Sequence, residues 1–284
     1  MVGEPIRSMR EVAHVPDGVI VPLTDGETFA RIDRRHPGAP TLLLLHGWLA
    51  SADLNWFGCY GVLGERWNVI ALDHRGHGRG LRSPRPFNLA AAADDAAELL
   101  DVLGVTGPVV AVGYSMGGPI ALHLAQRHPA RVQALVLTAT ALDFRGFWRT
   151  RLAWHGLGVL AAGLRFDGER RVVERLVTGL ATRDELVAAW RPRLLGEATR
   201  LETRAAIQAG REVARFDANA WAGELHLPAG LLLTAADRLV SPASQQRLAD
   251  VLGASVLSID GDHDVVLRRP ALFADSLRAV VSVV

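Results

Sequence analysis

A serine between two glycines is the residue pattern in this chain that most directly suggests chemistry. Residues 113–117 read G-Y-S-M-G and lie between an apolar run at 109–112 and an amphipathic stretch that begins at Gly118. In this strand-to-helix context, G-x-S-x-G is typical of a nucleophilic serine on a sharp turn, where side chains at 113 and 117 would collide with the neighbouring strand and helix. An ordinary turn with a helix-capping serine is the alternative. The context favours Ser115 as a nucleophile.

Two further residues complete the chemistry that a serine nucleophile needs. A serine hydroxyl requires an imidazole to take its proton and a carboxylate to orient that imidazole. His263 lies in a loop between the last predicted strand and the C-terminal helix, so we assign it as the base. Asp237 follows an apolar strand and precedes a helix, and we favour it as the orienting carboxylate over Asp143 or a role as a plain helix cap. The chain order Ser, Asp, His is the one associated with this serine turn.

Attack of a serine on a carbonyl creates an oxyanion, which two donors must stabilise. The backbone amide of Met116, directly after Ser115, is the first expected donor. The second is expected from the loop that follows the strand at 41–45, where Gly47 lets the backbone bend and the amide of Trp48 point inward. An ordinary strand-ending turn is the alternative for this loop.

Neither a metal nor any other cofactor is expected. His74 and His77 have H-x-x-H spacing, but they lie in a glycine-rich turn without nearby thiolates or a second ligand pair. The one cysteine, Cys59, can form neither an internal disulfide nor a thiolate cluster. Every basic side chain other than histidine is arginine, which excludes lysine chemistry. Chemistry must therefore depend on Ser, His, Asp or Glu.

Short apolar runs alternate with longer periodic segments, which predicts an α/β fold with a mainly parallel sheet and helices on both faces. The runs are continuously apolar, so both faces of these strands are expected to be buried. A turn at 24–27 predicts an antiparallel hairpin at the start of the sheet. Strands are predicted at 19–23, 28–34, 41–45, 68–72, 109–113, 132–138, 230–235 and 255–259, and helices at 52–66, 89–103, 118–127, 243–252 and 271–281, with Ser241 as an N-cap and Pro242 at the first helical position.

The alternation stops between about 143 and 216, where several helices follow one another. We interpret 143–216 as an inserted helical cap, and 1–142 together with 217–284 as the core domain. A capping box at 182–185 opens one cap helix, and Gly196 and Gly210 are candidate points where others end or kink. The apolar bulk of the cap predicts an apolar substrate pocket, or else packing of the cap on the core. The predicted pocket residues are Trp48, Phe144, Trp148, Trp154, Val240 and Val265.

These segments together resemble the α/β-hydrolase superfamily, in its cap-bearing branch of esterases, C–C bond hydrolases and cofactor-free haloperoxidases. The resemblance rests on residues 46–48, 73–78, 113–118, 237 and 261–263. It implies an eight-stranded sheet, a catalytic set of Ser115, Asp237 and His263, and oxyanion donors at Trp48 and Met116. Some members use an aspartate nucleophile in dehalogenases or epoxide hydrolases, and Ser115 argues against both.

Two positions depart from the pattern of this superfamily. Gly80 stands where a serine is common after the D-x-R-G-x-G run, and Asp262 replaces a frequent glycine. Neither position is expected to touch the reacting atoms.

Composition and charge limit the classes of partner. A net charge of +1 comes from 31 basic and 30 acidic groups that are scattered along the chain, which lacks the basic stripe of a nucleic-acid-binding protein. The longest candidate membrane run, at 157–164, is far shorter than the roughly 20 residues of a spanning helix. Residues 1–12 lack the apolar core of a secretory signal. We expect a globular cytoplasmic protein that acts on small molecules.

The leading hypothesis is a serine hydrolase that cleaves a carboxylic ester of a small to medium apolar substrate through an acyl-enzyme. Hydrolysis of C–C bonds or perhydrolase chemistry on the same three residues is an alternative within the same scaffold. A slow-turnover ligand receptor built on a hydrolase scaffold is an alternative from a different class.

Overall fold

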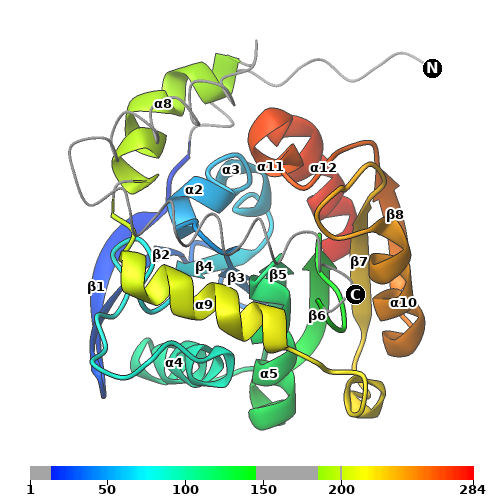
Figure 1. The fold of residues 1–284 in the computed structure, drawn as a ribbon. Coiled ribbons are helices and arrows are strands. Elements are labelled where there is room, and N and C mark those ends of the chain that lie inside the picture. The colour runs from blue at the N-terminus through cyan, green and yellow to red at the C-terminus, as the bar shows by residue number, and fades with distance from the viewer. Residues whose placement is uncertain (1–13, 145–184, 199) are drawn as a thin grey trace.

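The structure is a computed structural model that describes residues 14–144, 185–198 and 200–284. An eight-stranded sheet lies at the centre of this part of the chain (Figure 1). The strands are β1 (Asp17–Leu23), β2 (Gly26–Asp33), β3 (Thr41–Leu45), β4 (Asn68–Leu72), β5 (Val109–Tyr114), β6 (Val132–Thr138), β7 (Ala229–Thr234) and β8 (Ser255–Ile259). Their order is β1-β2-β4-β3-β5-β6-β7-β8. β2 pairs antiparallel with β1 and β4, and the other pairs are parallel. The predicted mostly parallel sheet with an N-terminal hairpin is confirmed.

Helices cover both faces of this sheet because the strand residues are apolar on both sides. In β3, Leu43 and Leu45 face one apolar cluster, whereas Leu42 and Leu44 face the other. Figure 1 shows α4 and α5 on one side of the sheet and α3, α11 and α12 on the other. The first cluster includes side chains of α4 (Leu89–Val102), α5 (Gly117–Arg127) and α10 (Pro242–Leu252), and the second includes those of α2 (Ala52–Trp56), α3 (Tyr60–Leu63), α11 (Val265–Arg268) and α12 (Pro270–Val281).

The single helix predicted over 52–66 is wrong, because the segment forms two short helices, α2 and α3. The break includes Gly58, where an added Cβ would lie 2.7 Å from Cβ of Pro270. The chain therefore passes close to the start of α12 at the point where a continuous helix would carry on. Helix α11 and the two 3-10 turns at Pro129–Arg131 and Ala222–Glu224 were not predicted.

Strand β8 corrects the expectation that both faces of every strand are buried. Four of its five residues are exposed, including Val256 and Leu257. β8 ends the sheet and pairs only with β7 among the described strands. An apolar run therefore marked a strand at this position but not a buried one.

The predicted start of α10 is confirmed, whereas the helix ends predicted at two glycines are wrong. The hydroxyl oxygen of Ser241 accepts from the amide of Ser244, and Pro242 opens α10, as predicted. Gly196 lies inside α8 (Glu185–Ala198) and Gly210 inside α9 (Thr203–Arg215), so neither glycine ends a helix. Of the predicted capping box, residues 182–184 lie outside the described residues.

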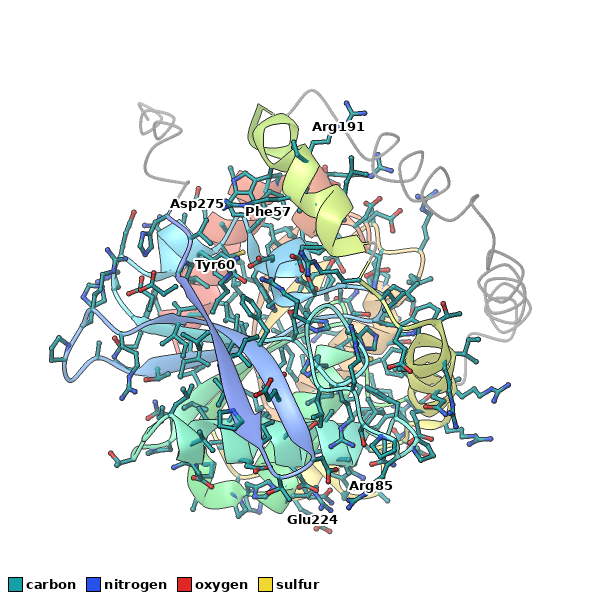
Figure 2. All side chains as sticks on the ribbon, turned by 90° about the vertical axis from the view of Figure 1, so that its left-hand side faces the viewer. Phe57, Tyr60, Arg85, Arg191, Glu224 and Asp275 are labelled. Carbon is teal, nitrogen blue, oxygen red and sulfur yellow. The ribbon has the colours of Figure 1, made fainter. Side chains whose placement is uncertain are left out.

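Helix α8 packs on the core through an apolar contact and an ion pair. The ring of Trp190 lies 5.4 Å from that of Phe57, which Figure 2 shows beside α8. Farther along α8, Glu197 lies 3.3 Å from Nη2 of Arg79 on the loop after β4. Trp190 therefore contributes to packing on the core, which was the alternative to a pocket role for the aromatic residues of the predicted cap.

Helix α9 packs against the segment between β4 and α4. Oε1 of Gln208 accepts from the amide of Phe87 at 2.9 Å. A Cβ at Gly76 would lie 2.1 Å from Cβ of Ala205, so the backbone of this loop touches the helix. Asp143 and Asp217, at the two ends of the predicted insertion, form an isolated antiparallel bridge. The division into a core and a cap stays a prediction.

No helix within the described ranges combines the length and apolar character that crossing a membrane requires.

Candidate active site

Ser115 occupies a backbone conformation that non-glycine residues rarely adopt. Its φ is 53°, between the end of β5 and the start of α5. Its amide donates to the carbonyl oxygen of Thr138 on β6 at 3.0 Å, which anchors the turn to the neighbouring strand. Such strain is stored where the surrounding structure enforces it, and it is frequent at functional sites.

The glycines around Ser115 are required by close backbone approach. A Cβ at Gly113 would lie 2.5 Å from the carbonyl oxygen of Gly117, and a Cβ at Gly117 would lie 2.0 Å from that of Leu45. A Cβ at Gly118 would lie 2.3 Å from Oγ1 of Thr140. The predicted collisions with the adjacent helix and strand are therefore confirmed.

Three predicted side chains meet at the carboxyl ends of β5, β7 and β8. Oγ of Ser115 lies 3.0 Å from Nε2 of His263, and Nδ1 of His263 lies 3.0 Å from Oδ2 of Asp237. If Nδ1 of His263 carries the proton and donates it to Asp237, Nε2 is left to accept from the hydroxyl of Ser115. This is the geometry that allows an imidazole to take the serine proton.

The carboxylate of Asp237 is buried and accepts from several donors. Its Oδ1 accepts from the amides of Leu239 and Val240, both at 2.8 Å. Its Oδ2 accepts from the hydroxyl of Thr234 at 2.9 Å and from Nε2 of Gln245 at 3.2 Å, besides facing His263. These bonds fix the orientation of the carboxylate.

Asp143, the rival for the orienting role, has other contacts. Its Oδ2 accepts from Nδ2 of Asn219 at 2.7 Å and lies 3.7 Å from Nη1 of Arg247. The structure thus brings Asp237 to His263 and places Asp143 at the bridge between the ends of the predicted insertion.

The loop after β3 passes over Ser115. A Cβ at Gly47 would lie 3.4 Å from Cβ of Ser115, and the amide of Gly47 donates to Oδ1 of Asn55 at 2.9 Å. The indole of Trp48 donates to the carbonyl oxygen of Ala206 on α9 at 2.7 Å. Met116 is the N-cap of α5, and the first amides of a helix have no partner within it. Both predicted oxyanion donors belong to segments that flank Ser115.

The predicted pocket residues fall into four groups. Trp48 is partly buried and packs against the first apolar cluster. Phe144 and Val240 are buried in the first apolar cluster, and the ring of Phe144 lies 6.3 Å from that of Phe216. Val265 is buried in the second cluster. Trp148 and Trp154 lie outside the described residues. A small, partly open pocket lies beside the N-terminus of α9, lined partly by Arg75, Phe87, Arg204 and Gln208.

Three other histidines form a buried cluster below the loop after β3. The ring of His46 lies 4.3 Å from that of His74 and 5.6 Å from that of His77. His46 donates from Nδ1 to the carbonyl oxygen of Gly47 and accepts at Nε2 from the amide of His74, so its imidazole is neutral. The described residues contain no group of three or more acidic, histidine or cysteine side chains that could hold a metal ion.

Burial controls the protonation of this histidine cluster. It lowers the pKa of His46 well below its ordinary value, that of His74 to about 3 and that of His77 to about 4. Asp73, at the end of β4, responds in the opposite sense, because burial raises its pKa to about 6 although its carboxylate accepts from the amides of Ala52 and Arg79. All four groups are therefore biased towards their neutral forms.

Gly80, one of the two departures from the superfamily pattern, has a steric cause. A Cβ at this position would lie 2.2 Å from the carbonyl oxygen of His74 and 2.5 Å from that of Asp73. The backbone folds back on itself too closely for any side chain.

Several residues that shape the site were not predicted from the sequence. Asn55 holds the loop after β3, and Thr234 and Gln245 hold Asp237. Thr234 gave a usable signal, because it is the polar residue that interrupts the apolar run of β7. Gln245 gave none, since a glutamine in an amphipathic helix is normally exposed, whereas this one is fully buried.

Comparisons with known proteins agree with this fold. Residues 40–270 match the family model described as alpha/beta hydrolase fold. A pimeloyl-[acyl-carrier protein] methyl ester esterase of Neisseria meningitidis serogroup B is 31% identical over 222 residues, which cover 76% of this chain and 82% of the relative.

Solved structures share the fold at low sequence identity. An enol-lactonase from Burkholderia xenovorans LB400 matches with a TM-score of 0.76 and 21% identity, over 93% of this chain and 100% of that one. A thermophilic esterase from Thermogutta terrifontis matches with a TM-score of 0.73 and 22% identity, over 94% and 98% of the two chains. By the family match and the Neisseria relative, the chain belongs to the alpha/beta hydrolase fold family.

Proposed function

We propose that this protein is a serine hydrolase that cleaves a carboxylic ester of a small to medium apolar substrate through an acyl-enzyme. The observation that carries the proposal is the continuous path of contacts from Asp237 through His263 to Ser115, with 3.0 Å at each step. The strained backbone of Ser115 and the nearby loop after β3 support it. The assignment of Ser115, Asp237 and His263 as catalytic residues is part of this proposal.

The reaction follows from the positions of these groups. Oγ of Ser115 attacks the ester carbonyl carbon while Nε2 of His263 takes the hydroxyl proton, and the carbonyl oxygen becomes an oxyanion that the amides of Trp48 and Met116 are proposed to stabilise. His263 then gives this proton to the departing alkoxide, which leaves as an alcohol. Water repeats the sequence on the acyl-enzyme and releases the carboxylic acid, which restores Ser115. Asp237 stabilises the imidazolium in both halves.

The relatives guide the choice of substrates to test. The Neisseria relative is named as an esterase that acts on a methyl ester of a pimeloyl group on acyl-carrier protein. A series of p-nitrophenyl esters with acyl chains of increasing length, together with pimeloyl monomethyl ester, therefore covers the proposed class. The location in the cytoplasm stays a prediction.

Ester hydrolysis by the Ser115→Ala variant tests the proposal. We expect the wild-type protein to release nitrophenol from at least one ester of the series, and the variant to lose at least about 10⁴-fold in kcat. Ser258→Ala, on the exposed strand β8, is the control and is expected to retain wild-type activity. Equal activity in Ser115→Ala would refute the assignment, and saturable binding of the ester without product would favour the receptor alternative.

A further inference from the structure

The main chain of His263 is held on both of its polar groups. The hydroxyl of Tyr114 donates to the carbonyl oxygen of His263. Oδ1 of Asp262 accepts from the amide of His263 at 2.8 Å. These two bonds do not involve the imidazole, so they act on the position of the backbone that carries it.

Tyr114 is placed to fix His263 relative to Ser115, because it directly precedes the serine at the end of β5. The side chain is buried, and its ring packs against those of Trp56, Phe273 and His263 at centroid distances of 6.2, 5.6 and 5.8 Å. Burial and nearby carboxylates raise the pKa of Tyr114 well above its ordinary value. The hydroxyl therefore keeps its proton and remains a donor.

Asp262 joins the loops that carry His263 and Asp237. Besides the amide of His263, its Oδ1 accepts from the amide of Arg238 at 2.9 Å, and its Oδ2 accepts from Nε of Arg238 at 2.5 Å. Arg238 directly follows Asp237. Asp262 therefore bonds both to the main chain of His263 and to the residue that follows Asp237.

We propose that Tyr114 and Asp262 are positioning residues that hold the main chain of His263 from two sides and keep its imidazole within reach of Ser115. The proposal rests on the proposed function. Asp237 fixes the ring of His263 through Nδ1 only, and a shift of the backbone would still carry Nε2 away from the serine. A displacement of about 1 Å in a reacting group can cost about 10²-fold in rate.

The Tyr114→Phe variant tests the first contact with a matched control. Phenylalanine keeps the ring contacts and removes only the hydroxyl. The chain has one other tyrosine, Tyr60 on α3, which is labelled in Figure 2. Tyr60 is also buried, and its hydroxyl donates to Oδ1 of Asp53 at 3.3 Å. We expect Tyr114→Phe to lower kcat about tenfold with KM within about twofold, and Tyr60→Phe to leave kcat within about twofold. Equal kcat in the two variants would overturn the proposal, as would a change in KM alone.

Asp262 supplies a second test that does not depend on the stability of Tyr114→Phe. In Asp262→Asn the amide oxygen can still accept from the backbone, so we expect partial rescue relative to Asp262→Ala, which is expected to lose about tenfold in kcat. Asp264→Asn, which changes a carboxylate of the same loop that pairs with Arg268 at 2.5 Å, is the control. Losses that are equal in Asp262→Ala and Asp264→Asn would overturn the role of Asp262.

A readout without substrate separates this proposal from the proposed function. Amide hydrogen exchange at His263 and Val265 is expected to be faster in Tyr114→Phe than in Tyr60→Phe. If the wild-type protein hydrolyses none of the esters and Ser115 is not labelled by a fluorophosphonate, the proposed function fails, and the exchange rates alone decide whether Tyr114 holds His263. Unchanged exchange in Tyr114→Phe would overturn the inference even in an active enzyme.

Discussion

Four of the histidines lie in two contrasting environments at the same end of the sheet. His263 is 19% exposed, with Nδ1 beside the carboxylate of Asp237 and Nε2 beside Ser115. His46, His74 and His77 are fully buried, and within the described ranges no ion pair joins them to a carboxylate. A buried imidazole without a counter-charge stays neutral at neutral pH and does not accept a second proton. Burial alone therefore makes a structural histidine, whereas a base also requires a carboxylate that stabilises its charged form.

The largest expected effect on kcat comes from replacing His263, and the same substitution at His74 is the matched control. His263→Leu removes the proposed base and is expected to lower kcat about 10⁵-fold, because among the described residues no other side chain forms a hydrogen bond with Oγ of Ser115. His74→Leu removes an imidazole whose two nitrogens have no hydrogen-bond partner in the described ranges, so kcat is expected to stay within about threefold. Steady-state kinetics on a p-nitrophenyl ester measures both. A large loss in His74→Leu with an intact melting temperature would contradict the distinction.

Asp237→Asn is expected to have the next largest effect. The amide keeps the shape of the side chain but removes the charge that is proposed to stabilise the imidazolium of His263, so we expect kcat to fall about 10⁴-fold with KM little changed. Asp143→Asn, at the rival carboxylate, is expected to retain activity because Asp143 contacts Asn219 and Arg247. If the two variants lose activity equally, the orienting role belongs to neither residue alone.

The stability of the protein towards acid is expected to depend on the buried histidines. Their pKa values in the folded state lie below the ordinary value of about 6.5, to about 3 for His74 and about 4 for His77. Between about pH 4 and 6.5 the unfolded chain therefore binds protons that the folded chain excludes. The contribution of these histidines to the free energy of unfolding is complete above this window, and it decreases as the pH falls through it. Each excluded proton contributes a slope of about 1.4 kcal/mol per pH unit.

Asp73 opposes this dependence, because its pKa is raised to about 6 in the folded state, which then binds a proton that the unfolded chain releases. The histidines outnumber it, so the net slope keeps its sign. Urea unfolding at pH 5 and pH 7 measures the difference in the free energy of unfolding between the two pH values. His74→Leu is expected to lower the number of protons bound on unfolding by about one, and so to reduce this difference. A stability that is equal at the two pH values, or greater at pH 5, would contradict the assignment of these histidines as neutral.

The sequence predicted the parts of the molecule that depend on local patterns. The apolar runs located the strands, and the glycines at 113 and 117 located the turn, because backbone approach there forbids any Cβ. Chain order brought Ser115, Asp237 and His263 together in the prediction, since parallel strands place their carboxyl ends at the same edge of a sheet.

What the sequence did not predict depends on contacts between distant segments. Gln245 is buried only because α10 packs against β7, and the hydroxyl of Tyr114 finds a partner only because the loop after β8 lies beside β5. The break in the helix predicted over 52–66 likewise depends on Pro270, more than 200 residues away in the chain. Polar side chains that hold a functional group through tertiary contacts follow no sequence spacing, so they cannot be recognised from the sequence.

Covalent labelling by a fluorophosphonate, followed by mass mapping of the adduct, tests most directly whether Ser115 is activated by His263. We expect a single adduct on the peptide that contains Ser115 in the wild-type protein, and no adduct in His263→Leu over the same time. An adduct on another serine, or labelling of Ser115 at the same rate in both proteins, would contradict it.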